Sequence, residues 1–252
     1  MSERHFAQRL RDRETIVGYW VASDNPPATE RIAAAGYDYV CLDLQHGLLD
    51  YAGALRGVMA AELGGAAGVI RVPVNDPSWI GRALDTGARA VIVPLVDTAE
   101  DAAVAVSACR YPPVGVRSYG PMRAAVRVGT DLRAADDQVA CIVMVETRAG
   151  LVNGREICAT PGVDAVYIGP SDLSIAIGEA NPKVGWGMPE YAEALATIRA
   201  AAAEAGIACG LHVNDGAAGA RALDEGLDFV SISNDLNHIS AFAAEHLGQA
   251  RP

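Results

Sequence analysis

The stretch Gly162-Val163-Asp164-Ala165-Val166-Tyr167-Ile168-Gly169-Pro170-Ser171-Asp172-Leu173 contains the structural unit from which the fold can be inferred. It begins with the turn Gly162-Val163-Asp164, continues with the apolar run Ala165–Gly169 and then becomes polar. A glycine at such a place ends the preceding helix in a left-handed conformation, and an apolar run of this length suits a buried strand. Turns of the same type, Gly36-Tyr37-Asp38 and Gly226-Leu227-Asp228, precede two other apolar runs.

Outward from this stretch, eight short runs rich in Val, Ile, Leu and Tyr alternate with Ala-rich segments whose apolar spacing suits helices. The runs are Val17–Val21, Tyr39–Leu44, Val69–Val72, Ala90–Leu95, Cys141–Val145, Ala165–Gly169, Ile207–Leu211 and Phe229–Ser233. Eight parallel strands with eight crossovers close most naturally into a barrel, so the sequence predicts an α/β protein with a TIM (β/α)8 barrel. An open doubly wound sheet is the alternative, but the first turn, Ala22-Ser23-Asp24-Asn25-Pro26-Pro27, has no GxGxxG loop.

Composition limits both the domain organisation and the partners. The 252 residues are 51% hydrophobic and 20% charged, which predicts one core and a single domain over residues 1–252. The formal net charge of -11 argues against a nucleic-acid partner, because phosphate binding needs clustered Lys and Arg. An anionic substrate would need positive charge concentrated locally, on a metal ion or a well-placed Arg.

Cysteine use and hydropathy predict a cytoplasmic protein with no membrane partner. The first twenty residues have no apolar stretch of the signal-peptide type, and no run approaches the roughly 20 apolar residues that span a membrane. The cysteines form no CxxC pair, so we expect buried free thiols in a reducing compartment. They are Cys41, Cys109, Cys141, Cys158 and Cys209.

The segment from Arg110 to Gln138 interrupts the alternation of strands and helices and carries several prolines and glycines. A long loop inside a compact domain is usually functional or part of an interface. Four further arginines lie within it, namely Arg117, Arg123, Arg127 and Arg133.

Polar residues follow several of the predicted strands. In a TIM barrel the active site lies at the carboxyl ends of the strands, so we expect these side chains to converge at one opening. They are Asp43 and His46 after the second strand, Arg71 at the third, Glu146 after the fifth and Asp172 after the sixth.

Four of these residues have both a chemical and a structural interpretation. Glu146 and Asp172 offer the oxygen ligands that suit Mg²⁺ or Mn²⁺, whereas either could instead be a helix N-cap or an exposed loop acid. Zinc is less favoured, since no His or Cys cluster accompanies them. His46 could serve as a general base or be structural. The Arg71 guanidinium could hold a substrate carboxylate or pair with an internal Asp.

Taken together, these motifs resemble the HpcH/HpaI aldolase family, the class II pyruvate aldolases that include 4-hydroxy-2-oxoheptanedioate aldolase. The resemblance covers nearly the whole chain, and the order and spacing of its motifs make it specific. The motifs are Ala35-Gly36-Tyr37-Asp38, Asp43-Leu44-Gln45-His46, Arg71 with Asn75-Asp76-Pro77, Val93-Pro94-Leu95-Val96, Gly115-Val116-Arg117, Val145-Glu146-Thr147-Arg148 and Ile168-Gly169-Pro170-Ser171-Asp172-Leu173.

The resemblance implies a lyase that binds a divalent cation (Mg²⁺, Mn²⁺ or Co²⁺) through Glu146 and Asp172. Arg71 would hold the oxo acid and stabilise its enolate, and His46, oriented by Asp85, would move a proton through a water molecule. Asp43 would support these residues from behind. The substrate carboxylate would be received by the backbone of Gly169, Pro170, Ser171 and Asp172.

The implied reaction joins the enolate of pyruvate or hydroxypyruvate to an aldehyde, or cleaves the product. Two rivals use the same enolate, namely oxaloacetate decarboxylation and a citramalyl-CoA type of cleavage, and a barrel that only binds partners is a third. The only lysine is Lys183, so a Schiff-base mechanism is not expected. Two departures from the family pattern leave the substrates open, because Met144 stands where many members have Gln and Gly47-Leu48-Leu49-Asp50 follows His46.

The resemblance also implies a homo-oligomer, a hexamer built as a trimer of dimers. The last predicted helix, His238–Leu247, has apolar residues spaced for one buried stripe, which we expect to pack on a neighbouring subunit. The stripe consists of Ile239, Phe242, Ala243 and Leu247.

Overall fold

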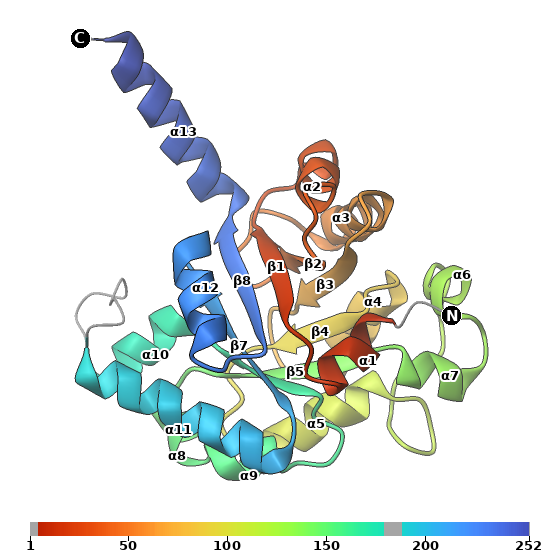
Figure 1. Cartoon of the computed structure of the whole chain (residues 1–252). Coiled ribbons are helices and arrows are strands. Elements are labelled where there is room, and N and C mark those ends of the chain that lie inside the picture. The colour runs from red at the N-terminus through yellow and green to blue at the C-terminus, as the bar shows by residue number, and fades with distance from the viewer. Residues whose placement is uncertain (1–4, 179–187, 252) are drawn as a thin grey trace.

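Each of the eight apolar runs forms a parallel strand, and the strands close into a barrel in the order of the sequence (Figure 1). The structure is a computed structural model that describes residues 5–178 and 188–251. The strands are β1 (Ile16–Val21), β2 (Tyr39–Asp43), β3 (Ala67–Arg71), β4 (Ala90–Val93), β5 (Ala140–Val145), β6 (Ala165–Ile168), β7 (Ala208–Val213) and β8 (Phe229–Asn234). The predicted TIM barrel is therefore confirmed.

Helices surround the barrel and connect its strands (Figure 1). The helices before β5 are α1 (Phe6–Arg11), α2 (Pro26–Ala33), α3 (Tyr51–Leu63), α4 (Pro77–Asp85), α5 (Ala99–Cys109), α6 (Ala124–Val128) and α7 (Leu132–Asp137). Those after β5 are α8 (Arg148–Val152), α9 (Gly154–Cys158), α10 (Pro170–Ala176), α11 (Pro189–Ala205), α12 (Gly216–Asp224) and α13 (Asp235–Ala250). Helix α1 closes the amino end of the barrel, where Phe6 packs on Tyr39, the first residue of β2, with ring centroids 5.5 Å apart.

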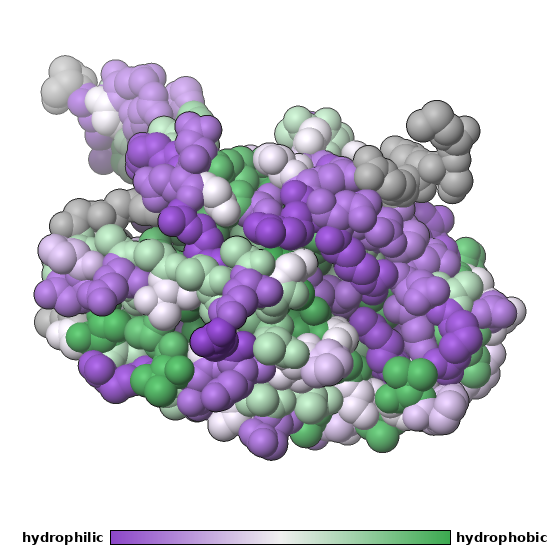
Figure 2. All heavy atoms as spheres, turned by 60° about the horizontal axis from the view of Figure 1, so that its bottom comes forward, coloured by the Kyte–Doolittle hydropathy of each residue, from purple (hydrophilic) through white to green (hydrophobic). Residues whose placement is uncertain are grey.

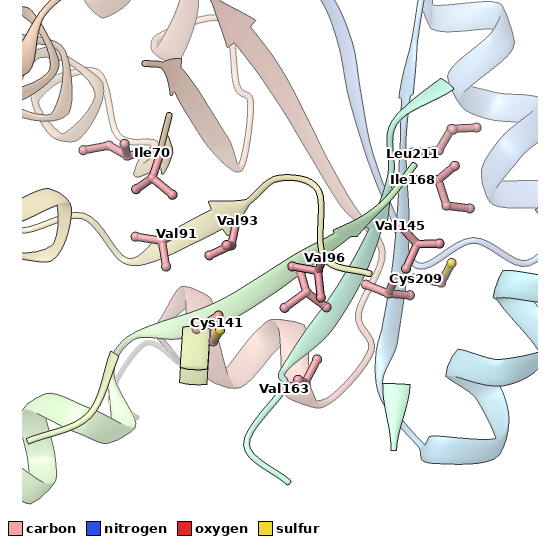
Figure 3. Packing of buried hydrophobic residues seen from close by; sticks show 14 of the residues in the cluster. Ile70, Val91, Val93, Val96, Cys141, Val145, Val163, Ile168, Cys209 and Leu211 are labelled. Atoms are coloured by element: carbon pink, nitrogen blue, oxygen red, sulfur yellow. The ribbon is translucent and has the colours of Figure 1, made fainter. Parts of the chain in front are cut away.

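The hydrophobic core has two layers because side chains alternate along each strand. In β4, Val91 and Val93 pack outward in the layer beneath the helices (Figure 3), whereas Ile92 between them packs in the barrel interior. In β2, Tyr39 and Cys41 belong to the interior layer. Because the same alternation continues to the carboxyl ends, the last residues of several strands face the barrel axis.

The segment from Arg110 to Gln138 contains the short helices α6 and α7, and arginines fasten it to the barrel. Arg117 is buried and its Nη2 lies 2.9 Å from Asp85 Oδ1, on α4. Arg123 and Arg127 both pair with Glu62 on α3. These three arginines therefore form ion pairs within the chain.

Helix α13 projects away from the barrel (Figure 1), and of its residues Asp235 alone is buried. Ile239 and Phe242 are 57% and 60% exposed, so the predicted apolar stripe has no partner within the described part of this chain. On the face seen in Figure 2, hydrophobic residues form separate patches within a mainly hydrophilic surface. None of the helices described here is long and apolar enough to cross a membrane.

The cysteines behave as the sequence predicted. All five thiols are buried and none forms a disulfide.

Candidate active site

The carboxyl ends of the strands enclose a cavity of about 290 Å³. It is lined by Trp20, Ala22, Asp43, His46, Arg71, Met144, Glu146, Tyr167, Gly169, Pro170, Ser171, Asp172, His212 and Asn234. Every site residue expected from the sequence lines this cavity except Asp85. The convergence expected for strand-end residues of a TIM barrel is therefore present.

Arg71 is held by Asp43 in a two-pronged ion pair. Arg71 Nε donates to Asp43 Oδ1 at 2.8 Å, and Nη2 donates to Oδ2 at 2.6 Å. The guanidinium carbon lies 4.9 Å from the ring centroid of Trp20, whose Nε1 donates to Asp43 Oδ2 at 3.1 Å. The internal-acid interpretation of Arg71 is thus confirmed, but it does not exclude the substrate interpretation, because Arg71 also lines the cavity and no described residue accepts a hydrogen bond from its Nη1.

Both members of this pair are stabilised in their charged forms. Burial would raise the pKa of Asp43, but the hydrogen bonds and charge of Arg71, with the indole of Trp20, outweigh burial and place the pKa below its usual value. Burial would lower the pKa of Arg71, and Asp43 reverses that effect. One wall of the cavity therefore carries a fixed ion pair that holds the guanidinium of Arg71 in place.

Asp43 also shapes the loop that carries His46. The backbone N–H groups of Gln45 and His46 donate to Asp43 Oδ1 at 3.0 and 3.2 Å. His46 is exposed at the cavity, and its ring makes no hydrogen bond to the residues described here. One buried carboxylate thus positions both the guanidinium and the loop that presents the imidazole.

Glu146 is only 2% exposed, although its side chain lines the cavity. Its Oε1 accepts a hydrogen bond of 2.9 Å from the backbone N–H of Leu95, a residue that adopts a positive φ of 54°. Burial raises the pKa of Glu146, and the nearby charge of Asp172 adds to the effect. A carboxylate in this place would be stabilised by a cation.

Gly169 leaves room for the second oxygen of Glu146. A Cβ at position 169 would overlap Oε2 and lie 2.9 Å from the Cβ of Glu146. Gly169 is the N-cap of α10, and Asp172 lies in the first turn of that helix and is exposed. Neither carboxylate is a helix N-cap, because Gly169 and Thr147 occupy those positions. The N-cap interpretation of Glu146 and Asp172 was wrong, and Glu146 is not an exposed acid.

The donor set fits a hard divalent cation with few protein ligands. Within residues 5–178 and 188–251, no donor bonds to Oε2 of Glu146 or to the carboxylate of Asp172. The same residues contain no group of three His, Cys, Asp or Glu side chains that could hold a metal. A cation bound by Glu146 and Asp172 would complete its coordination with oxygen atoms of water or substrate, as Mg²⁺ commonly does.

Asp85 does not meet His46 within the chain. It ends α4 outside the cavity, where it accepts the hydrogen bond from Arg117. Burial raises the pKa of Asp85, and the charge of Arg117 opposes that rise. The expected contact between Asp85 and His46 is therefore not formed by one copy of the chain.

Sequence reasoning missed several residues of the cavity wall, namely Trp20, Ala22, Tyr167, His212 and Asn234. Strand alternation could have found Trp20, Tyr167 and His212, because each follows an inward-facing position by two residues. Lys183 lies outside the described residues.

Comparison with known proteins bears on this site. The model of the HpcH/HpaI aldolase/citrate lyase family matches residues 17–241. This chain belongs to that family. The predicted resemblance to the HpcH/HpaI aldolases is thus confirmed across the barrel.

Relatives of this chain include proteins named as aldolases. A hydroxypyruvate/pyruvate aldolase of Rhizorhabdus wittichii is 38% identical over 95% of both chains. A 5-keto-4-deoxy-D-glucarate aldolase of Klebsiella pneumoniae is 36% identical over 92% of this chain and 90% of its own length. An HpcH/HpaI family protein from Burkholderia cenocepacia has a crystal structure with a TM-score of 0.88, 35% identity and 98% coverage of both chains. Aldolases are carbon–carbon lyases, so the predicted enzyme class is also confirmed.

Proposed function

We propose that this chain is a divalent-metal-dependent aldolase that forms or cleaves 4-hydroxy-2-oxo acids through the enolate of a small 2-oxo acid. The observation that carries the proposal is the cavity in which Glu146 and Asp172 face the Arg71–Asp43 pair. Deprotonating the carbon next to a keto group at neutral pH requires positive charge near the keto oxygen. A cation bound by the two carboxylates would provide one source of that charge, and the guanidinium of Arg71 provides a second.

The cation assigned to Glu146 and Asp172 is Mg²⁺, Mn²⁺ or Co²⁺. When bound, it would polarise the keto group and stabilise the negative charge of the enolate. Buried Glu146, fixed by the Leu95 N–H, orients one oxygen toward the space beside Gly169. Asp172 supplies the second carboxylate from the first turn of α10.

The chain's own residues hold the substrate. Arg71 presents a charged donor whose position is fixed by Asp43, so little reorganisation is needed when negative charge develops on the keto oxygen. The backbone around Ser171 and Asp172, at the start of α10, receives the substrate carboxylate. His46, exposed at the cavity, moves the proton of the hydroxyl group that forms or breaks with the carbon–carbon bond.

The experiment is a cleavage assay with the purified chain. After exhaustive treatment with EDTA, release of pyruvate from a 4-hydroxy-2-oxo acid should fall to background. Addition of Mg²⁺, Mn²⁺ or Co²⁺ should restore it. Undiminished cleavage after EDTA, or no cleavage with any of the three cations, would contradict the proposal.

We also propose that the chain forms a homo-oligomer, a hexamer arranged as a trimer of dimers, through α13. The proposal is supported by the uncovered stripe of Ile239, Phe242, Ala243 and Leu247, since such a stripe is stabilised by burial against a neighbour. Sedimentation at micromolar concentration should give a mass several times the 26.2 kDa of one chain. Phe242→Glu should weaken association at least about tenfold. Ala241→Glu, on the opposite side of the helix, is the matched control, and a monomeric wild-type chain would refute the proposal.

The oligomer bears on the role expected for Asp85. Because Asp85 does not contact His46 in its own chain, orienting that imidazole requires the carboxylate of one copy to approach the His46 of another. We assign the predicted pairing to neighbouring copies.

A further inference from the structure

His212 is a polar residue of the cavity that the proposed mechanism does not use. It lies near the carboxyl end of β7, two residues after Gly210 and four after Ala208, which packs in the barrel interior. Its ring packs edge-on against Trp20, with centroids 5.5 Å apart and planes at 78°. The imidazole is therefore fixed on the cavity wall formed by β7 and β1.

The ring nitrogens of His212 have no internal partner. Among residues 5–178 and 188–251, no donor or acceptor is hydrogen-bonded to either nitrogen, and the residue is partly exposed at the cavity. Burial, with a contribution from the charge of Arg71, lowers the pKa of His212 to about 4. The imidazole is thus neutral at neutral pH and offers one N–H donor and one acceptor nitrogen.

The position of His212 favours a contact with the oxo acid rather than with the far end of an aldehyde. The ring of Trp20 contacts both His212 and the guanidinium of Arg71, so the imidazole and the guanidinium lie beside the same indole. Arg71 is the residue proposed to hold the oxo acid. A substituent on the carbon next to the keto group would lie within reach of this wall.

A hydroxyl group matches a neutral imidazole better than a charged group does. A carboxylate or phosphate would use only the N–H donor, whereas a hydroxyl can donate to one nitrogen or accept from the other. Trp20, which His212 contacts, and Met144, which lines the same cavity, are mainly apolar, so an unpaired hydroxyl buried there would be destabilised.

We propose that His212 is a specificity-determining residue that hydrogen-bonds a hydroxyl group at C3 of the 2-oxo acid. The enzyme then favours a 3-hydroxylated nucleophile, hydroxypyruvate, over pyruvate. This inference rests on the proposed aldolase function, because it concerns the oxo acid whose enolate that function requires.

The test measures exchange of the C3 protons of pyruvate and of hydroxypyruvate into deuterated solvent, with Mn²⁺ and without any aldehyde. Omitting the aldehyde isolates the nucleophile. His212→Phe keeps a ring against Trp20 but removes both nitrogens, whereas His212→Gln keeps a donor and an acceptor. We expect His212→Phe to lower the ratio of hydroxypyruvate to pyruvate exchange, measured as kcat/KM, by about tenfold. His212→Gln should recover a substantial part of that ratio.

The outcomes separate the two proposals. If the wild-type chain exchanges both acids but His212→Phe leaves their ratio unchanged, His212 is a packing residue and this inference is wrong. The same conclusion follows if His212→Gln lowers the ratio as much as His212→Phe does. If the wild-type chain exchanges neither acid with Mg²⁺, Mn²⁺ or Co²⁺, the proposed function itself fails. Thermal unfolding of both variants shows whether they are folded, and the ratio is internal to each protein, so a partly unfolded fraction does not alter it.

Discussion

Replacing Glu146 with glutamine should lower aldol cleavage by at least about 10³-fold at a fixed concentration of Mn²⁺. The substitution keeps the volume of the buried side chain beside Gly169 but removes the charge that would bind a cation. Asp172→Asn should have a similar but smaller effect, because Asp172 is exposed and water can replace its oxygen. Raising the Mn²⁺ concentration should recover part of the activity in Asp172→Asn. Initial rates measured against metal concentration test both expectations.

Asp215→Asn is the matched control for these variants. Asp215 also follows a barrel strand, but it caps α12 through Ala218 and does not line the cavity. Since Asn is as good an N-cap as Asp, this variant should keep both its stability and its activity. Full activity of Glu146→Gln after EDTA treatment would show that no cation bound by Glu146 takes part.

The barrel could be predicted from the sequence because its signal is local. Alternating apolar runs and helical segments need only the periodicity of each element, and every run overlaps one strand. The ends of the strands were predicted less accurately. The run Ala90–Leu95 ends as a strand at Val93, because Pro94 cannot donate to the ladder and Leu95 turns to a positive φ to reach Glu146.

At β7 the predicted strand is too short, and for that reason the prediction misses His212. The predicted strand Ile207–Leu211 was ended where the sequence becomes polar, but β7 continues to Val213. A polar side chain pointing inward at a strand end does not interrupt the backbone ladder, so composition alone marks the boundary too early. Counting alternate positions from Ala208 would have turned position 212 toward the barrel axis.

Contacts between distant residues were beyond sequence reasoning. The pairing of Arg71 with Asp43 depends on the register of β2 and β3, which places residue 43 opposite residue 71. The pairing of Asp85 with Arg117 joins α4 to a segment whose path no periodicity indicates. The sequence identified the side chains that face the cavity but not the partners that each already has.

Changes at Arg71 and His46 should separate substrate activation from proton transfer. Loss of the guanidinium should lower the rates of aldol cleavage and of pyruvate methyl-proton exchange by about a hundredfold. Both rates should fall because both reactions need the enolate. Arg71→Ala also leaves buried Asp43 unpaired, at a cost of about 3–5 kcal/mol in stability. Arg71→Lys is therefore the better probe, since it keeps the ion pair but cannot reproduce the two-pronged contact. Thermal unfolding distinguishes lost stability from lost binding, and unchanged exchange in folded Arg71→Lys would contradict the role.

His46→Ala should instead depress aldol cleavage by roughly 10² to 10⁴-fold and leave methyl-proton exchange much less affected. The imidazole is exposed at the cavity and has no internal partner among the described residues, so its removal should not disturb the Arg71–Asp43 pair. The backbone N–H of residue 46 would still donate to Asp43, which keeps the loop in place. Cation binding, measured by calorimetry with Mn²⁺, should match that of the wild-type chain. A variant that cleaves at the wild-type rate from about pH 6 to about pH 9 would show that another group or a water molecule moves the hydroxyl proton.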